Sequence, residues 1–274
     1  MRILISGGSG FLGHGLTRRL LSEGHDVRIY SRGEYAQHKM RMQFCDEERL
    51  GFFIGDVRDA SRLERAMERC DVVLHAAALK RIEIGQMNPD EMVKTNVLGT
   101  MNVIEAARRA KVKRVVFISS DKAYEPVSPY GLSKALAEHL ILSANTMMFG
   151  PKFVVCRYGN VFNSTGSIVP VWRSMVESGA ADVFVTDLDC TRFFMTLDEA
   201  VALVVSAMTD NQELLIPTLP AYRIGDLADA MELKTTVVGL PAHEKKHESM
   251  SVGNCSEHAR RMSVDELREE LKRV

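Results

Sequence analysis

The sequence predicts an α/β fold built on a doubly wound parallel sheet, followed by a small second lobe. Short β-branched runs alternate with longer amphipathic stretches from residue 1 to about 158, the pattern of repeated βαβ units. A glycine-rich turn follows the first of these runs at residue 7. After residue 158 the alternation becomes irregular, and loop signals at 163–166 and 217–220 separate shorter helical segments.

The alternation predicts the elements one by one. The expected strands are short runs rich in Val, Ile and Phe: Arg2–Ser6, Val27–Tyr30, Phe52–Gly55, Val72–His75, Val115–Ser119 and Phe153–Arg157. Apolar residues recur at helical spacing in Leu12–Ser22, Ala60–Arg69, Asp90–Arg109 and Leu132–Asn145, and again near Ile168–Ser178 and Asp198–Met208. No internal repeat or low-complexity tract interrupts this order.

The composition is that of an ordinary globular protein. The 274 residues carry a formal charge of −1, which gives no general attraction to nucleic acid or to an anionic membrane. Five cysteines lie far apart without paired spacing, which argues against a zinc site or a disulfide framework and favours a reducing cytoplasm. No apolar stretch has the length of a signal peptide or a membrane span. We expect a cytoplasmic protein with no metal, nucleic-acid or membrane partner.

The glycine-rich turn predicts a dinucleotide-binding site. Gly7, Gly10 and Gly13 follow the first strand, and Phe11 and Leu12 open the first helix. Glycine allows the tight turn, and without a Cβ the backbone N–H groups and the helix dipole can meet a pyrophosphate. This context makes the predicted sheet a Rossmann-type fold with the cofactor at the carboxyl ends of its strands.

The end of the second strand favours NADP over NAD. An acidic residue there would pair the ribose hydroxyls, whereas a basic residue accommodates a 2′-phosphate, and this strand ends in Ser31-Arg32. The alternative is that Arg32 is only a solvated loop residue. Later strand ends supply further cofactor candidates, which are equally ordinary turn and packing residues: Asp56, Val57, Ala76 and Ala77.

A second cluster of polar residues follows the fifth strand. Tyr130 and Lys134 lie four residues apart on a predicted helix and hence on the same face. The lysine charge would lower the pKa of the phenol, which suits a base that removes a hydroxyl proton. Ser120, Asp121 and Lys122 end the fifth strand at the edge where ligands of such sheets bind.

At this point the motifs resemble one family. The sequence is similar to the inverting UDP-N-acetylglucosamine 4,6-dehydratases, which are extended short-chain dehydrogenases/reductases of bacterial polysaccharide biosynthesis. The similarity runs from residue 1 to about 205 and returns weakly at Glu244–Glu248 and Met262–Leu271. It is carried by His75–Lys80, Lys94–Gly99, Ser119–Ala123, Tyr130–Lys134, Arg157–Val161 and Thr191–Phe193.

The resemblance implies a lyase reaction with transient oxidation. Bound NADP⁺ takes a hydride from C4 of the sugar, water is lost across C5 and C6, and the hydride returns to C6. Tyr130, held by Lys134 and assisted by Ser120, would remove the C4 hydroxyl proton. Asp121 would protonate the leaving C6 hydroxyl, and Lys122 would take the C5 proton if burial or nearby Lys134 lowers its pKa. The alternative makes Asp121 a helix cap and Lys122 a surface charge.

Further candidate residues follow the fourth strand. Lys80 is expected to reach cofactor or substrate, with a solvated loop lysine as the alternative. Asn96, a poor helix former at a predicted mid-helix position, is expected to hold the catalytic helix or a water at the cofactor site. Asn160, Ser167, Arg192 and Glu244 resemble the sugar-diphosphate and uridine contacts of the family.

The chain departs from the family in its second lobe. An arginine expected to grip the diphosphate is missing around Pro241–His243, and Thr165 stands where a basic residue is usual. The lobe also looks trimmed relative to typical members. These departures put the nucleotide part of the substrate in more doubt than the sugar chemistry.

We therefore expect two parts, an NADP-binding domain at 1–158 and a mainly substrate-binding lobe at 159–274, with some segments of the second returning to the first. A homo-oligomer is expected. Two rival functions stay open. A UDP-sugar 4-epimerase shares the cofactor turn and C4 oxidation but needs no acid/base pair at C5 and C6. A non-catalytic NADP-binding protein needs none of the four polar groups Asp121, Lys122, Tyr130 and Lys134.

Overall fold

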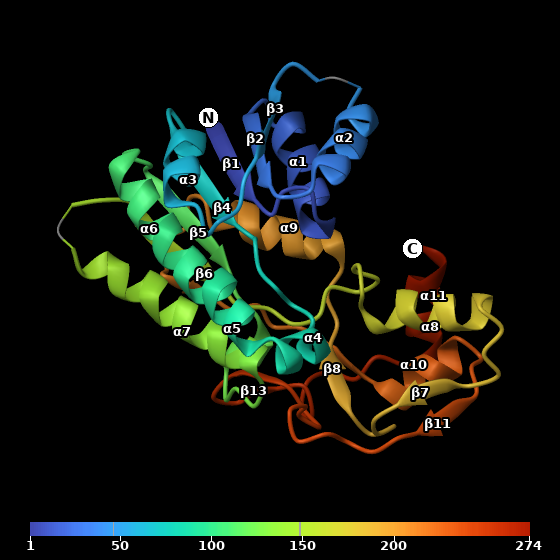
Figure 1. Cartoon of the computed structure of the whole chain (residues 1–274). Coiled ribbons are helices and arrows are strands. Elements are labelled where there is room, and N and C mark those ends of the chain that lie inside the picture. Colours follow the sequence, from blue (N-terminus) through green and yellow to red (C-terminus); the bar gives the residue numbers. More distant parts are fainter. Residues whose placement is uncertain (46, 148) are drawn as a thin grey trace.

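The computed structural model of the chain describes residues 1–45, 47–147 and 149–274. Its centre is a parallel sheet with the strand order β3-β2-β1-β4-β5-β6-β9 (Figure 1). This order runs outward in both directions from β1 and β4, which is the doubly wound arrangement. The predicted fold class is confirmed. The strands are β1 (Arg2–Ser6), β2 (Asp26–Ser31), β3 (Leu50–Ile54), β4 (Val72–His75), β5 (Arg114–Ile118), β6 (Lys152–Cys156) and β9 (Leu214–Leu215).

Helices cover both faces of the sheet. On one face lie α1 (Phe11–Ser22), α2 (Glu34–Gln43) and α9 (Leu197–Ser206), whose buried side chains share one apolar cluster with alternate strand residues. On the other face lie α3 (Ala60–Met67), α6 (Gly99–Arg109) and α7 (Pro129–Ser143), which share a second cluster. Both clusters exist because successive strand residues point to opposite faces and each face receives apolar side chains.

The six predicted strands are all present, each within two residues of its predicted ends. Four helices that the structure describes were not predicted, α2, α4 (Ile82–Met87), α10 (Ile224–Ala230) and α11 (Val264–Lys272). Helix α2 buries only Gln37 and Met40, so it carries too little apolar periodicity to be recognised from sequence. In the described residues, no helix combines the length and the apolar character that crossing a membrane requires.

The long helix predicted at 90–109 is present but not uniform. It divides into α5 (Pro89–Met92), a π-helical turn η1 (Val93–Leu98) and α6. π-turns inside helices are rare and are found mostly at functional sites, because the extra residue redirects side chains. Here the π-turn contains Asn96, one of the predicted site residues.

The later part of the chain divides its elements between two places. Helix α9 packs on α1, and β9 pairs with β6, so these later elements lie with the sheet (Figure 1). A separate lobe contains β7 (Val183–Val185), β11 (Thr235–Val237), α8 (Ile168–Glu177), α10 (Ile224–Ala230) and α11 (Val264–Lys272) around its own apolar cluster. The division at residue 158 stays a prediction.

Two further strand pairs lie between these parts. Strand β8 (Thr191–Phe193) pairs with β10 (Ala221–Arg223), and β12 (Ser249–Ser251) forms a hairpin with β13 (Asn254–Cys255). The hairpin contacts the short 3-10 turn η2 (Asp121–Ala123) that follows β5. This contact brings the β12–β13 hairpin to the carboxyl edge of the sheet.

A buried histidine lies at this edge of the sheet. His75, at the end of β4, is fully enclosed, with Nδ1 2.7 Å from Ser6 Oγ and Nε2 3.1 Å from Thr100 Oγ1. The Thr100 hydroxyl donates to the Asn96 carbonyl, so it accepts from His75 Nε2–H, which assigns the neutral tautomer. Burial lowers the pKa of His75 to about 3, with a smaller contribution from Lys134. His75 is therefore a buried packing residue.

This histidine predicts a pH dependence of stability. The folded pKa lies below the unfolded value near 6.5, so between pH 6.5 and 3 the unfolded chain binds a proton that the folded chain does not. Lowering the pH from 7 to 5 should cost about 2 kcal/mol of unfolding free energy through His75. Urea unfolding at both pH values checks this, and His75→Gln should remove that part of the loss. An identical pH dependence in the variant would contradict the assignment.

Candidate active site

The site is built where β5 ends and α7 begins. Ser120 ends the segment after β5 and caps η2 by accepting from the Lys122 N–H at 3.3 Å. Ser128 caps α7 by accepting from the Gly131 N–H at 3.1 Å. A Cβ at Gly131 would lie 2.5 Å from the Lys122 carbonyl oxygen, so only glycine lets α7 approach η2 this closely. The close approach places Tyr130 next to Ser120, Asp121 and Lys122.

Asp121 and Lys122 are neither a helix cap nor a surface charge. The Asp121 side chain is 1% exposed and that of Lys122 is 16% exposed, and Lys122 Nζ lies 3.2 Å from Asp121 Oδ1. Oδ1 also accepts from the Ser120 hydroxyl at 2.9 Å, whereas Oδ2 is buried and has no hydrogen-bond partner. A buried carboxylate oxygen without a partner is costly in a folded protein and points to a ligand. The alternative that Asp121 is only a helix cap and Lys122 only a surface charge is therefore wrong.

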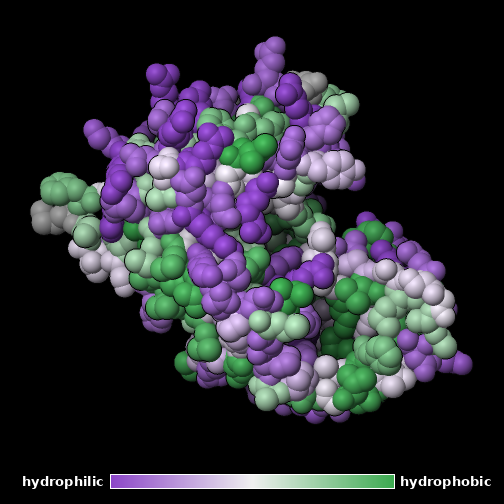
Figure 2. Space-filling model, in the orientation of Figure 1, coloured by the Kyte–Doolittle hydropathy of each residue, from purple (hydrophilic) through white to green (hydrophobic). Residues whose placement is uncertain are grey.

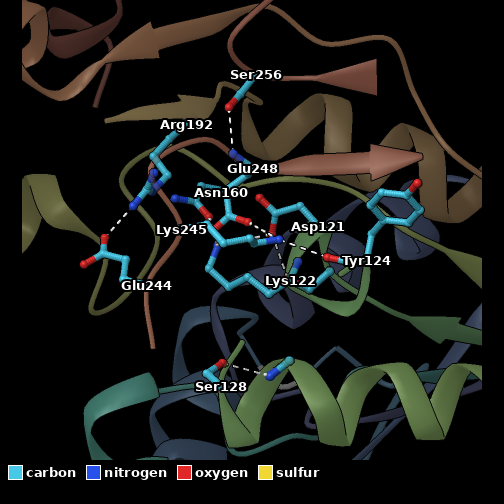
Figure 3. Close-up of polar contacts among 12 residues, drawn as sticks. Asp121, Lys122, Tyr124, Ser128, Asn160, Arg192, Glu244, Lys245, Glu248 and Ser256 are labelled. Atoms are coloured by element: carbon cyan, nitrogen blue, oxygen red, sulfur yellow. Dashed lines mark hydrogen bonds and ion pairs between the residues drawn. The ribbon is translucent and has the colours of Figure 1, made fainter. Parts of the chain in front are cut away.

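A second carboxylate, Glu248, lies on the other side of Lys122. Its Oε1 is 3.3 Å from Lys122 Nζ, and its Oε2 is 2.8 Å from Lys245 Nζ (Figure 3). Burial raises the pKa of Asp121, which Lys122 only partly offsets. Burial acts the same way on Glu248, but Lys122, Arg192 and Lys245 lower its pKa to about 2. Two carboxyl groups with pKa values pushed apart are suited to different roles, Asp121 accepting and returning a proton and Glu248 staying ionised.

The expected pKa of Lys122 is wrong for this structure. Sequence reasoning required burial or Lys134 to lower it toward neutrality. Burial does act in that direction, but Asp121 and Glu248 raise the pKa of Lys122 above its ordinary value. Lys122 is an ammonium ion here, and any role as a base needs its proton to move first.

The Tyr130–Lys134 pair is present on one face of α7, with different electrostatics from those expected. Burial raises the pKa of Tyr130, and the groups that act against it are Ser120, by a hydrogen bond, and Lys122. Lys134 donates instead to the Ile118 carbonyl, and burial lowers its pKa to about 7 against the effect of Glu138. The expected lowering of the Tyr130 pKa by Lys134 is therefore wrong.

Asn96 holds the catalytic helix, as expected. From the π-turn its amide Nδ2 donates to Ser133 Oγ of α7 at 2.9 Å and to the Leu79 carbonyl at 2.9 Å. Its Oδ1 accepts from the Leu79 N–H at 2.8 Å. One buried side chain thus ties α7 to the loop after β4. Lys80 follows directly in that loop and is exposed.

Part of the predicted substrate set gathers around Lys122. Asn160 Oδ1 accepts from Lys122 Nζ at 3.1 Å. Arg192 is buried in β8, and its guanidinium donates to Glu244 and, at 3.1 Å, to the Lys246 carbonyl. Lys122 and Arg192 share one pocket with the loop that carries Glu244. Its lining residues are Ile82, Lys122, Val127, Ser128, Arg192, His243, Glu244, Lys245 and Glu248.

Ser167 precedes α8 outside this lining, and its buried hydroxyl has no partner. Arg81, next to Lys80, packs on the same loop, since a Cβ at Gly166 would lie 3.2 Å from its guanidinium. The predicted contacts of Ser167 and Lys80 with substrate stay predictions.

The glycine turn has the shape of a dinucleotide site. Gly7 has φ +70°, and a Cβ there would lie 2.8 Å from the Ala77 backbone nitrogen. A Cβ at Gly13 would lie 2.1 Å from the Gly8 carbonyl oxygen, which explains the close packing of α1 on β1. Gly10 begins α1 with no side chain capping the helix and no acidic residue in the first turn. The free N–H groups of Phe11 and Leu12 therefore fit the pyrophosphate of a dinucleotide.

The other predicted cofactor residues differ in which groups they present to a cofactor. Ser31 ends β2 and receives hydrogen bonds from Ser9 at 2.8 Å and from Gln37 at 2.9 Å. Arg32 follows it, 56% exposed, with Nη1 3.7 Å from Asp56 Oδ2. Ala76 and Ala77 lie beside Gly7. Val57 packs in the core, where a Cβ on Gly99 would lie 2.7 Å from its side chain, so it offers at most its backbone.

Comparison with known proteins agrees with this geometry. The model of the polysaccharide biosynthesis protein family matches residues 3–266. The chain belongs to this family. It is 40% identical over 256 residues to a UDP-N-acetylglucosamine 4,6-dehydratase (inverting) of Campylobacter jejuni serotype O:2, covering 90% of this chain and 76% of that protein. The resemblance found in the sequence is confirmed.

Two further comparisons bear on function and fold. A UDP-glucose 4-epimerase of Rickettsia rickettsii is 36% identical over 263 residues, which cover 90% of this chain and 76% of the epimerase. The solved structure of Pen from Bacillus thuringiensis has a TM-score of 0.93 at 32% identity, over 100% of this chain and 98% of that one. The family thus includes relatives named for two different activities.

Sequence reasoning missed Glu248, Lys245 and His243 as pocket residues. Nothing in composition or periodicity marks them, because they lie in an irregular segment that only the tertiary fold brings to η2. The one available signal was the weak return of family similarity at Glu244–Glu248.

Proposed function

We propose that the protein is an NADP-dependent nucleotide-sugar 4,6-dehydratase acting on UDP-N-acetylglucosamine with inversion at C5. The observation that carries the proposal is the buried Asp121–Lys122 pair beside Tyr130, with Asp121 Oδ2 left without a partner. An epimerase needs no second acid/base pair, and a merely cofactor-binding protein has no use for a buried carboxyl group of this kind. The similarity to the Campylobacter dehydratase supports the same substrate class.

Each group of the site has a part in the reaction. Bound NADP⁺ supplies the hydride acceptor for C4 and the hydride donor for C6. Tyr130, hydrogen-bonded to Ser120, removes the C4 hydroxyl proton. Arg192, which lines the pocket, and Asn160, which contacts Lys122, supply hydrogen-bonding groups for the sugar diphosphate. The Gly7–Gly13 turn holds the cofactor pyrophosphate, and Arg32 holds the 2′-phosphate.

The Asp121–Lys122 pair can supply and recover every proton that the elimination step requires. Transfer of one proton from the Lys122 ammonium to the Asp121 carboxylate, 3.2 Å away, gives an amine and a carboxylic acid. The amine then takes the C5 proton, and the C–H electrons form the C5–C6 double bond. The C6–O bond breaks as Asp121 returns its proton to the leaving hydroxyl, which departs as water. The pair ends as the ion pair seen in the structure.

The protein also has a face suited to self-association. Large apolar side chains are exposed on neighbouring segments η1, α6 and α7, where Figure 2 shows apolar surface. They are Val93, Leu98, Met101, Leu132 and Leu136. Contiguous exposed apolar residues of this kind mark protein interfaces, which supports the proposed homo-oligomer. The proposed compartment is the cytoplasm.

The reaction is tested by mass spectrometry of UDP-N-acetylglucosamine after incubation with the protein and NADP⁺. We expect the product to be lighter by one water molecule. In deuterated water the product should carry deuterium at an inverted C5, because the proton taken from one face is replaced from solvent on the other. An unchanged mass with a new C4 epimer would instead establish the epimerase.

The cofactor preference depends on Arg32. Arg32→Ala should weaken NADPH binding by about 10- to 100-fold, because a charge-assisted hydrogen bond contributes about 1.5–3 kcal/mol. NADH affinity should be unchanged, and Arg32→Lys should keep part of the preference. Fluorescence titration with both cofactors measures this. Equal affinities in the wild type, unaltered by either substitution, would refute the NADP assignment.

Asp121 and Lys122 should be separable from the first oxidation. Lys122→Ala should oxidise C4 and then stall, because no amine remains for the C5 proton, so NADPH absorbance should accumulate in a single turnover. Asp121→Asn should also block water loss, since an amide cannot supply the proton. Turnover should fall by about 10²-fold or more in each.

Lys113→Ala is the matched control, because Lys113 is 78% exposed at the opposite edge of the sheet and pairs with Asp71. The Lys113→Ala variant should turn over substrate at the wild-type rate. Full turnover in both site variants, without C5 exchange, would leave the epimerase as the better account.

A further inference from the structure

Glu248 is a buried carboxylate whose position is fixed by the fold. It directly precedes β12, is 2% exposed, and contacts η2 through the Lys122 ammonium. Its N–H donates to Ser256 Oγ at 2.9 Å, and its carbonyl accepts from the Ser256 N–H at 2.7 Å. Ser256 Oγ is in turn 2.7 Å from Thr191 Oγ1 in β8. The β12–β13 hairpin and β8 therefore hold Glu248 in place independently of Lys122.

The oxygens around Lys122 indicate whether its side chain is an ammonium ion or a neutral amine. Asp121 Oδ1, Asn160 Oδ1 and Glu248 Oε1 lie 3.2, 3.1 and 3.3 Å from Nζ. An ammonium has three N–H donors, so all three find an acceptor. A neutral amine in the same place would point its lone pair at one of these oxygens. Asp121 belongs to η2 and Asn160 to the loop after β6, so Glu248 is the one of the three acceptors that comes from another part of the fold.

We propose that Glu248 is a positioning residue that holds the Lys122 side chain as an ammonium ion against Asp121. It acts through Lys122 and is not placed as an acid or base itself. The proposal rests on the dehydratase assignment for its consequence in catalysis, but the ion triad itself is a property of the folded protein. Glu248 keeps Lys122 charged in the resting site, and the amine becomes a base only when its proton passes to Asp121.

The charged groups that face Lys122 are few. Asp121 and Glu248 raise its pKa, Arg192 opposes them, and Tyr130 contributes weakly from α7. Lys245 lies beyond Glu248, where it donates to the Tyr124 carbonyl at 2.9 Å and pairs with Glu248 Oε2. Removing the Glu248 charge therefore leaves Asp121 as the only carboxylate in contact with Lys122 among the described residues.

The test is a titration of Lys122 that needs no turnover. The protein is labelled at lysine Cε, the Lys122 resonance is assigned with Lys122→Arg, and its shift is followed with pH in the wild type and in Glu248→Gln. Loss of an opposite charge at this distance should lower the pKa of Lys122 by about 1 to 3 pH units. At pH values where Lys122 of the Glu248→Gln variant has lost its proton, the wild-type resonance should still be that of an ammonium ion. Identical curves overturn the proposal.

Two variants guard against a merely structural effect. Glu138→Gln removes another buried carboxylate, which pairs with Arg157 and does not contact Lys122, so it should leave the Lys122 curve unchanged. Glu248→Asp keeps the charge and should keep the Lys122 resonance closer to wild type than Gln does. If Glu248→Gln does not fold, a curve for Glu248→Asp that is displaced to lower pH supports the proposal, and an undisplaced one overturns it.

Turnover gives a second and separate measure. On the alkaline side, where the Asp121–Lys122 pair loses its shared proton, the pH at which turnover falls to half its maximum should be lower in Glu248→Gln by the same amount, through kcat rather than KM. If the wild type removes no water from UDP-N-acetylglucosamine, the proposed function fails while the lysine titration still decides the role of Glu248. If the wild type does remove water and neither pH profile moves, only the role of Glu248 is wrong.

Discussion

One buried ammonium between two carboxylates organises the site. Lys122 reaches Asp121 in its own turn and Glu248 from the far end of the chain, so a single ion triad joins the sheet domain to the β12–β13 hairpin. Burying three charges is favourable only when each is paired and hydrogen-bonded, and removing one partner leaves an uncompensated charge. The close approach of α7 at Gly131, the Ser120 cap and the hairpin geometry all serve to keep this cluster closed.

The same arrangement explains how one pair of residues can supply both an acid and a base. Asp121 and Lys122 differ by the position of one proton, and the balance between their two states is set by the groups around them. Glu248 favours the charged state, while burial favours the neutral one. A site of this kind is stable at rest and changes state when its surroundings change, with no need for a strained backbone.

Much of this was predictable from sequence, for identifiable reasons. Strands of a doubly wound sheet are continuous apolar runs, so β1 to β6 were found within two residues, and the Gly7–Gly13 turn and the Tyr130–Lys134 spacing are local patterns. Helix α2 was missed because it buries few apolar residues. The pKa of Lys122 and the partner of Lys134 were misjudged because they depend on Glu248 and the Ile118 carbonyl, which only tertiary packing brings near.

The hairpin that carries Glu248 also sets an order of assembly. During synthesis strands β1 to β6, with Asp121 and Lys122, leave the ribosome well before β12 and β13 are made, and domains generally fold as they emerge. The nascent sheet domain therefore holds Asp121 and Lys122 without the third charge, with this edge open to solvent. The finished pocket forms only when the last strands dock, so the competence of the site is coupled to completion of the chain.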